Sequence, residues 1–334
     1  MVTNGVAPFS YSLQGKKVWV AGHNGMVGSA LLRRLSSEGC DILTVNKSEL
    51  DLRNQAGVNT WMAAHKPDVV IIAAAKVGGI MANGENPAAF FYDNMMIATN
   101  IMHAAYEQNV ERLLFLGSSC IYPRDCAQPI KEEYLLTGAL EPTNEAYALA
   151  KIAGLKMAGY YRTQYGCDFI SAMPCNLYGV GDMYDAQNSH VIPAIMMKAH
   201  AAKMRGDNIL TLWGSGSPLR EFMYADDLAD VLVNLLQKYR NAEPINVGTE
   251  QEITIRDLAK IICEVVGYEG QIEFDTSKPD GTPRKVLDNA KMNALLSKDK
   301  ICQKNGKYDM KIRLAQCYKD FLGRYDDGDA RQYA

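Results

Sequence analysis

The stretch Lys17-Val-Trp-Val-Ala-Gly22-His-Asn-Gly25-Met-Val-Gly28 decides the fold of this chain. Its apolar first half is typical of a buried strand, and residues 26–38 continue with the apolar spacing of a helix. The three glycines permit a tight turn, close approach of a pyrophosphate and close helix–strand packing. Free N–H groups at the helix start can bind phosphate. The stretch therefore predicts a dinucleotide site rather than a glycine-rich turn without a ligand.

Strands and helices alternate through the first half of the chain. The predicted strands are 17–22, 41–45, 68–74, 112–117 and 168–173, and the predicted helices are 26–38, 54–65, 87–108 and 144–165. Repeated strand–helix–strand units imply a parallel sheet covered on both faces, with right-handed crossovers. We expect an α/β protein: a Rossmann-type doubly wound parallel sheet with a smaller C-terminal α/β substrate lobe.

After Tyr178 the alternation breaks at a polar loop over 179–190. Beyond it we predict helices at 191–204, from Ala225, at 254–266 and near 288–297, and strands at 209–213 and 244–248. The last strand is expected to rejoin the first sheet. We therefore predict a cofactor-binding Rossmann domain over 1–178, with a returning segment near 224–250. The substrate-binding lobe is expected to comprise 179–223 and 251–334.

The composition is that of an ordinary globular enzyme. The 334 residues are 48% apolar and 22% charged, with a net charge of −3 and no basic stripe, so nucleic acid is not an expected partner. No apolar run is long enough to span a membrane, so no membrane partner is expected either. Residues 1–14 lack a signal-peptide core and are interpreted as a loose tail. Eight scattered cysteines without a Cys-x-x-Cys pair favour the reducing cytoplasm, with no metal site and no disulfide framework.

Tyr147 and Lys151 stand four residues apart in the helix predicted at 144–165. This spacing places both side chains on one helical face. A nearby cation favours the phenolate, so we expect Lys151 to lower the pKa of Tyr147 and to adapt it for proton transfer to a sugar or alcohol oxygen. Taken alone, the motif is a weak signal that more often marks an ordinary surface pair.

The run Leu116-Gly-Ser118-Ser119-Cys120-Ile-Tyr122-Pro123 follows an apolar strand. Strand ends in doubly wound sheets line the ligand crevice, where a serine hydroxyl can donate to a substrate carbonyl oxygen. Cys120 is two residues further on and can face the same crevice. Taken alone, it can equally be a small buried apolar residue, the commonest fate of a free cysteine.

The residues after the second strand bear on the choice between NAD and NADP. NAD sites usually carry an acidic residue at this strand end, whereas the sequence here is Asn46-Lys47. A lysine can pair with a 2′-phosphate, which favours NADP, although Lys47 can also be a solvated charge. Asp51 is expected next to the adenine, with a plain helix-start signal as the alternative.

Together, Gly22-x-x-Gly25-x-x-Gly28, Ser118-Ser-Cys120 and Tyr147-x-x-x-Lys151 resemble the extended short-chain dehydrogenase/reductase superfamily. Longer strings narrow the resemblance, over about residues 16–290, to the GDP-L-fucose synthase family. These strings are Ala73-Ala-Ala-Lys-Val-Gly-Gly-Ile80, Leu113-Leu-Phe-Leu-Gly-Ser-Ser-Cys-Ile-Tyr-Pro123, Glu141-Pro-Thr-Asn-Glu145, Asn188-Ser-His-Val-Ile-Pro193, Trp213-Gly-Ser-Gly216 and Lys278-Pro-Asp-Gly-Thr-Pro-Arg-Lys285. The resemblance implies conversion of GDP-4-keto-6-deoxy-D-mannose to GDP-L-fucose by 3,5-epimerisation followed by NADPH-dependent reduction at C4.

The resemblance also implies roles for individual residues. Tyr147 matches the general acid at C4, Lys151 the lysine that assists it, and Ser118, rather than Ser119, the third member of the triad. Cys120 and His190 match the base and acid that epimerise C3 and C5. The implied substrate contacts are Lys198, Trp213, Arg220 and Asp280. Lys198 stands where the family often has arginine. Lysine keeps the positive charge but cannot form the bidentate hydrogen bonds of a guanidinium.

The NADP(H) contacts implied by the resemblance follow the glycine turn and the strand ends. They are Gly22, His23, Asn24, Gly25, Met26, Val27, Gly28, Asn46, Lys47, Asp51, Leu52, Ala74, Ala75, Lys151, Pro174, Asn176, Leu177 and His190. The family commonly has a basic residue where Asn24 stands, which leaves more of the 2′-phosphate binding to Lys47. The resemblance further implies a homodimer formed through a four-helix interface of the helices at 87–108 and 144–165.

Three other functions compete with this one. A nucleotide-sugar 4,6-dehydratase needs carboxylates where this chain has Ser118-Ser119-Cys120. A C4 reductase without epimerase activity, or an enzyme for another GDP-4-keto-deoxysugar such as a colitose precursor, need not keep Cys120 and His190 together. A non-catalytic NADP-binding regulator would be expected to have lost part of the Ser118, Tyr147 and Lys151 set.

Overall fold

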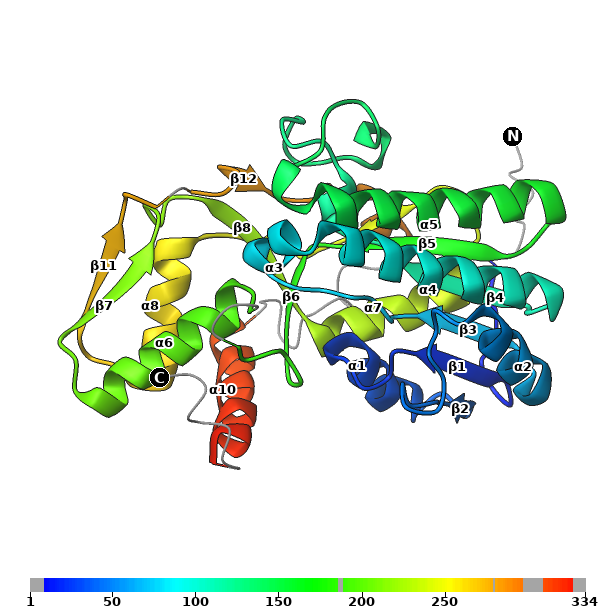
Figure 1. The fold of residues 1–334 in the computed structure, drawn as a ribbon, viewed down its shortest axis with the longest axis horizontal. Helices are drawn as coiled ribbons and strands as arrows, with labels where there is room; N and C mark the ends of the chain where they lie inside the picture. Colours follow the sequence, from blue (N-terminus) through cyan, green and yellow to red (C-terminus); the bar gives the residue numbers. More distant parts are fainter. Residues whose placement is uncertain (1–8, 186–188, 279, 297–308, 327–334) are drawn as a thin grey trace, which may run out of the picture.

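A six-stranded parallel sheet forms the larger part of the computed structural model, which describes residues 9–185, 189–278, 280–296 and 309–326 (Figure 1). Across the sheet the strands are β2 (Asp41–Leu43), β1 (Lys17–Ala21), β3 (Val69–Ile72), β4 (Arg112–Leu116), β5 (Phe169–Pro174) and β9 (Ile245–Val247). Every neighbouring pair is parallel. The strand order reverses between β1 and β3, so their carboxyl ends border the crevice where such sheets bind ligands. The predicted Rossmann-type sheet is confirmed, and the strand expected near 244–248 rejoins it by pairing with β5.

Helices cover both faces of this sheet, which is why its central strands are apolar throughout. On one side α1 (Met26–Leu35) packs against α7 (Ala225–Lys238). On the other, α4 (Pro87–Glu107) lies between α2 (Gln55–His65) and α5 (Glu145–Tyr165) (Figure 1). A short helix, α3 (Ile80–Glu85), precedes α4. Within the described residues, no helix combines the length and the apolar character needed to cross a bilayer.

The smaller lobe has its own sheets and hydrophobic core (Figure 1). Strand β8 (Leu219–Tyr224) pairs antiparallel with β10 (Glu252–Thr254) and parallel with both β6 (Asn176–Tyr178) and β12 (Arg284–Lys285). A separate pair joins β7 (Ile209–Trp213) and β11 (Gln271–Asp275). Helix α8 (Ile255–Val266) packs against both α6 (Val191–Arg205) and α10 (Met310–Asp326). Met196, Leu258 and Phe321 are buried in this core.

Several elements were not predicted, and most of them are short. These are α3, α10, β6, β8, β10, β11, β12 and the 3-10 turns η1 (Ser119–Ile121), η2 (Glu132–Tyr134) and η3 (Pro142–Asn144). Strands of two or three residues carry no periodicity, and a partner strand rather than their own sequence stabilises them. The helix expected near 288–297 is the six-residue α9 (Ala290–Leu295), which packs against β9.

The prediction of a loose tail over 1–14 is wrong for its described part, whereas residues 1–8 lie outside the described residues. The Tyr11 hydroxyl donates to Glu111 at 2.6 Å, and the Tyr11 amide donates to the Gln237 carbonyl at 2.8 Å. Leu13 is fully buried in the main core. Apolar residues spaced two apart therefore dock this segment onto the edge of the Rossmann domain.

Candidate active site

The glycine turn after β1 forms a close-packed cradle for a pyrophosphate. Gly22 has φ +90°, and a Cβ there would lie 2.6 Å from the backbone of Ala74. A Cβ on Gly28 would lie 2.1 Å from the Gly22 carbonyl oxygen, so only glycine fits either position. Helix α1 starts after Gly25 with no side-chain cap, which leaves the N–H groups of Met26 and Val27 available to phosphate oxygens. The cradle fits the dinucleotide that the sequence predicts.

Two asparagine side chains meet beside this cradle, where β2 ends. The Asn24 amide donates to the Asn46 side-chain oxygen at 3.0 Å, and both residues are exposed. Lys47 follows and is also exposed. The free amide N–H of each asparagine and the Lys47 ammonium are all donors that suit a ribose carrying a 2′-phosphate. The structure thus brings together the three residues that the sequence assigned to this end of the cofactor.

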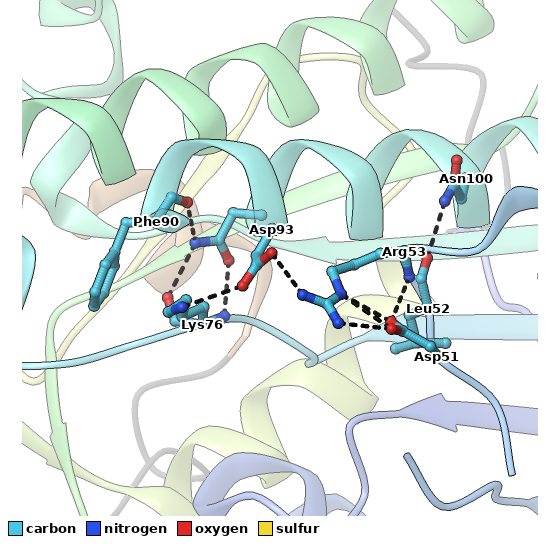
Figure 2. Close-up of polar contacts among 8 residues, drawn as sticks. Asp51, Leu52, Arg53, Lys76, Phe90, Asp93 and Asn100 are labelled. Atoms are coloured by element: carbon cyan, nitrogen blue, oxygen red, sulfur yellow. Dashed lines mark hydrogen bonds and ion pairs between the residues drawn. The ribbon is translucent and has the colours of Figure 1, made fainter. Parts of the chain in front are cut away.

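A chain of ion pairs joins the loop after β2 to helix α4 and to the loop after β3 (Figure 2). The Arg53 guanidinium donates to Asp51 at 2.7 Å and to Asp93 at 3.0 Å, and Lys76 donates to the other Asp93 oxygen at 3.2 Å. Arg53 lowers the pKa of Asp51 to about 2, so the carboxylate stays charged. Asp51 is not the start of α2, because Asn54 caps that helix by accepting from the Gly57 amide.

Two buried asparagines of α4 fix the same loops through their backbones. Asn94 accepts from the Lys76 amide at 2.9 Å and donates to the Lys76 carbonyl at 3.0 Å. Asn100 donates to the Leu52 carbonyl at 3.0 Å (Figure 2). These bonds hold Leu52 on one loop and Lys76, the residue after Ala74 and Ala75, on the next. Sequence reasoning missed both asparagines, since buried amides inside an apolar helical pattern were their only signal.

Ser118, Cys120, Tyr147 and Lys151 gather where β4 ends. The Ser118 hydroxyl caps η1 by accepting from the Cys120 amide at 3.3 Å. Lys151 on α5 is buried and donates to the Leu116 carbonyl at 2.8 Å, which ties the helix to the strand end. Its ammonium lies 5.8 Å from the centre of the Tyr147 ring. The four side chains thus border one corner of the sheet edge.

Burial is the main cause of the pKa shifts of Tyr147 and Lys151. It raises the pKa of Tyr147 above its ordinary value of 10; Cys120 adds to the rise, and a hydrogen bond with Ser118 opposes it. Burial also lowers the pKa of Lys151 to about 8. The expectation that Lys151 lowers the pKa of Tyr147 is therefore wrong here, because the ammonium is directed at the Leu116 carbonyl and the loss of solvent outweighs its field. The phenol stays protonated at neutral pH, as a proton donor must.

His190 and Cys120 belong to different lobes of the structure. His190 immediately precedes α6 in the smaller lobe, and its side chain is exposed. Neighbouring groups still shield the imidazole in part, and this partial desolvation lowers its pKa. In the described part of the chain, no hydrogen bond links His190 to Cys120 or Tyr147. Cys120 instead has a partner that sequence reasoning did not assign: Lys285, whose ammonium lies 3.6 Å from the sulfur.

The predicted substrate residues form a second group in the smaller lobe. Trp213, at the end of β7, is 61% exposed, and the ammonium groups of Lys198 and Lys278 lie 5.2 Å and 5.6 Å from its ring centre. Asp280 accepts from the amide and hydroxyl of Ser215 at 2.9 Å and 2.6 Å. An exposed aromatic ring with two cations close to it suits a nucleobase joined to phosphates.

The remaining predicted site residues are Arg220, on β8, and those at and after the end of β5. Burial lowers the pKa of Arg220, and the charge of Asp280 opposes this shift. Pro174 ends β5, and Asn176 and Leu177 belong to β6, where the Asn176 amide donates to the Glu221 carbonyl at 2.9 Å. Among the described residues, no three His, Cys, Asp or Glu side chains gather as a metal site would require.

Comparisons with known proteins point to one family. The model of the NAD dependent epimerase/dehydratase family matches residues 18–248. A GDP-L-fucose synthase of Sinorhizobium fredii is 50% identical over 317 residues, which cover 95% of this chain and 99% of that protein. A GDP-L-colitose synthase of Yersinia pseudotuberculosis is 40% identical, with 87% and 95% covered. A solved GDP-L-fucose synthetase of Naegleria fowleri bound to NADP is 28% identical, with a TM-score of 0.84 and coverage of 96% and 99%.

Proposed function

The chain belongs to the NAD dependent epimerase/dehydratase family, and we propose that it converts GDP-4-keto-6-deoxy-D-mannose to GDP-L-fucose with NADPH. The observation that carries this proposal is the convergence of Ser118, Cys120, Tyr147 and Lys151 at one strand end beside the glycine cradle. The relatives that are GDP-L-fucose synthases match nearly the full chain. We propose that residues 1–178 together with 224–250 bind the cofactor, and that residues 179–223 and 251–334 bind the substrate.

Epimerisation requires proton exchange at the two carbons that flank the C4 ketone. The hydrogens at C3 and C5 are acidic because the enolate left behind places its charge on the C4 oxygen. Cys120 removes a proton from one face, and His190 supplies one to the other. A thiol and an imidazole both change protonation state near neutral pH, which suits them to this exchange. The hydroxyls of Ser118 and Tyr147 donate to the enolate oxygen.

Reduction uses the same corner of the site. When bound, NADPH supplies the hydride for C4. Tyr147 gives its proton to the C4 oxygen, and the raised pKa of its phenol keeps that proton in place until the oxygen becomes basic. Lys151 lies one helical turn away and holds the nicotinamide ribose. The GDP group is held by Lys198, Trp213, Arg220 and Asp280. The exposed indole ring of Trp213 stacks on the nucleobase of GDP.

Product identification tests this proposal. The purified protein is incubated with GDP-4-keto-6-deoxymannose and NADPH, and the sugar formed is identified by NMR. GDP-L-fucose is the expected product. An unepimerised 6-deoxyhexose would show a C4 reductase without epimerase activity. No turnover of this substrate, together with turnover of a GDP-4-keto-3,6-dideoxysugar, would favour the colitose-type reaction of the Yersinia relative.

We also propose that two copies of the chain associate through α4 and α5. These helices pack against each other and carry exposed large apolar side chains, among them Tyr92 (57% exposed) and Tyr160 (66% exposed). A four-helix contact would cover them. The Tyr92→Glu/Tyr160→Glu variant should sediment as a monomer while the parent chain sediments as a dimer, and a monomeric parent at micromolar concentration would contradict this. A cytoplasmic location is proposed as well, because Cys120 must stay reduced to act as a base.

A further inference from the structure

Lys285 contacts the proposed epimerisation base from a distant part of the chain. Its ammonium nitrogen lies 3.6 Å from the Cys120 sulfur, although the two residues are 165 positions apart. Cys120 follows β4 in the Rossmann domain, whereas Lys285 ends β12 at the edge of the smaller lobe. Both residues are partly buried. The contact therefore crosses the crevice between the two lobes at the reaction centre.

The backbone on either side of Lys285 is fixed by hydrogen bonds. The Val286 amide donates to the Gln128 side chain at 3.0 Å, and the Ile130 amide donates to the Val286 carbonyl at 2.8 Å. The Leu287 amide donates to the buried carboxylate of Glu221 at 3.1 Å. Lys285 itself pairs with Arg220 in the β12–β8 register. These bonds fix the backbone position from which the Lys285 side chain reaches Cys120.

The other groups around Cys120 do not supply a positive charge to its sulfur. The Ser118 hydroxyl accepts from the Cys120 amide, and the Tyr147 phenol opposite is neutral because burial raises its pKa. The Lys151 ammonium donates to the Leu116 carbonyl instead. The Cys126 thiol also feels the charge of Lys285, although burial raises its pKa. Among the described residues, Lys285 is the cation in hydrogen-bond contact with Cys120.

A cation at this distance favours a thiolate over a thiol, and only the thiolate can act as a base. We propose that Lys285 is a positioning residue for the epimerisation half of the reaction, placing a positive charge beside the Cys120 sulfur and directing that sulfur at the sugar. The inference rests on the proposed function. In the step it supports, the C–H bond at C3 or C5 breaks, an S–H bond forms, and the electron pair moves onto the C4 oxygen. His190 protonates the opposite face of the carbon, water then resets both residues, and the Lys285 ammonium is unchanged throughout.

The first test measures the thiolate directly and needs no substrate. The wild-type, Lys285→Met and Lys285→Arg proteins are alkylated with iodoacetamide between pH 6 and pH 10, and the modified tryptic peptides are quantified by mass spectrometry. Trypsin cuts after Arg112, Arg124 and Lys131, so Cys120 and Cys126 fall in separate peptides. Cys40, far along the chain near β2, is the internal control.

We expect alkylation of Cys120 in Lys285→Met to be slower by roughly tenfold at pH 7 and to recover at high pH, as loss of a neighbouring opposite charge dictates. Lys285→Arg should retain most of the wild-type rate, and Cys40 should react alike in all three proteins. An unchanged Cys120 profile in both variants would overturn the proposal. If Lys285→Met does not fold, Lys285→Gln decides, because its amide keeps a polar group at this position and removes the positive charge; a wild-type Cys120 profile in Lys285→Gln would overturn the proposal.

The second test separates this role from one in substrate binding. Deuterium uptake at C3 and C5 is followed by NMR in heavy water without NADPH. Lys285→Met should lower the maximal exchange rate about tenfold and leave the KM for the GDP-sugar within about twofold, because the lysine acts on the base. A raised KM with normal exchange and normal alkylation would identify a phosphate-binding lysine and overturn the inference. Absence of exchange in the wild type would contradict the proposed function, whereas the alkylation result would still decide the lysine–cysteine pairing.

Discussion

Replacing Lys151 by methionine should abolish reduction and at the same time relieve a pH-dependent cost of folding. Burial lowers the pKa of Lys151 from 10.5 to about 8, so the folded protein holds this proton less tightly than the unfolded chain. At 1.36 kcal/mol per pKa unit, this difference costs roughly 3 kcal/mol of stability at pH 7. The cost is fully present below pH 8, shrinks as the pH rises and vanishes above 10.5, where both states are neutral. A methionine of similar length carries no charge and avoids it.

The measurement is urea unfolding of the cofactor-free wild-type and Lys151→Met proteins at pH 7 and pH 9.5. The lost hydrogen bond to the Leu116 carbonyl shifts the variant's stability by a constant amount at both pH values, so the pH dependence isolates the charge. We expect the free energy of unfolding of the variant, relative to wild type, to fall by about 2 kcal/mol between the two pH values. Lys156→Met, on the partly exposed part of the same helix, is the control and should show no such change. A difference independent of pH would refute the reasoning.

Three further predictions concern the chemistry and the cofactor. Tyr147→Phe removes the proton donor for C4 and should slow reduction by about 100-fold or more, while solvent exchange at C3 and C5 continues; reduction at the wild-type rate would exclude this role. Cys120→Ser and His190→Asn should impair exchange of those hydrogens, measured by NMR in heavy water without NADPH. If both exchange like wild type, these residues are structural. Lys47→Ala should weaken NADPH binding about tenfold and leave NADH nearly unchanged in a titration, because it removes a charge-assisted contact to the 2′-phosphate; equal losses would show that Lys47 does not contact that phosphate.

The sequence alone determined the elements whose information is local. The apolar strand, the spacing of Gly22, Gly25 and Gly28 and the following helix encode one continuous turn, and no distant residue is needed to recognise it. The alternation of long apolar segments likewise predicted the parallel sheet, because strands covered on both faces must be apolar throughout. Helical periodicity placed Tyr147 and Lys151 on one face, and their side chains are neighbours in the structure.

Only the tertiary structure decided which charges meet and how they are solvated. Lys285 reaches Cys120, and Arg53 reaches Asp93, through packing of elements far apart in the chain, and no local pattern records such contacts. The pKa of Tyr147 rises where its spacing from Lys151 predicted a fall, because the balance depends on burial, and burial is a property of the whole fold. The short strands β10 and β12 exist for the same reason, since each is held by hydrogen bonds to β8 rather than by its own periodicity.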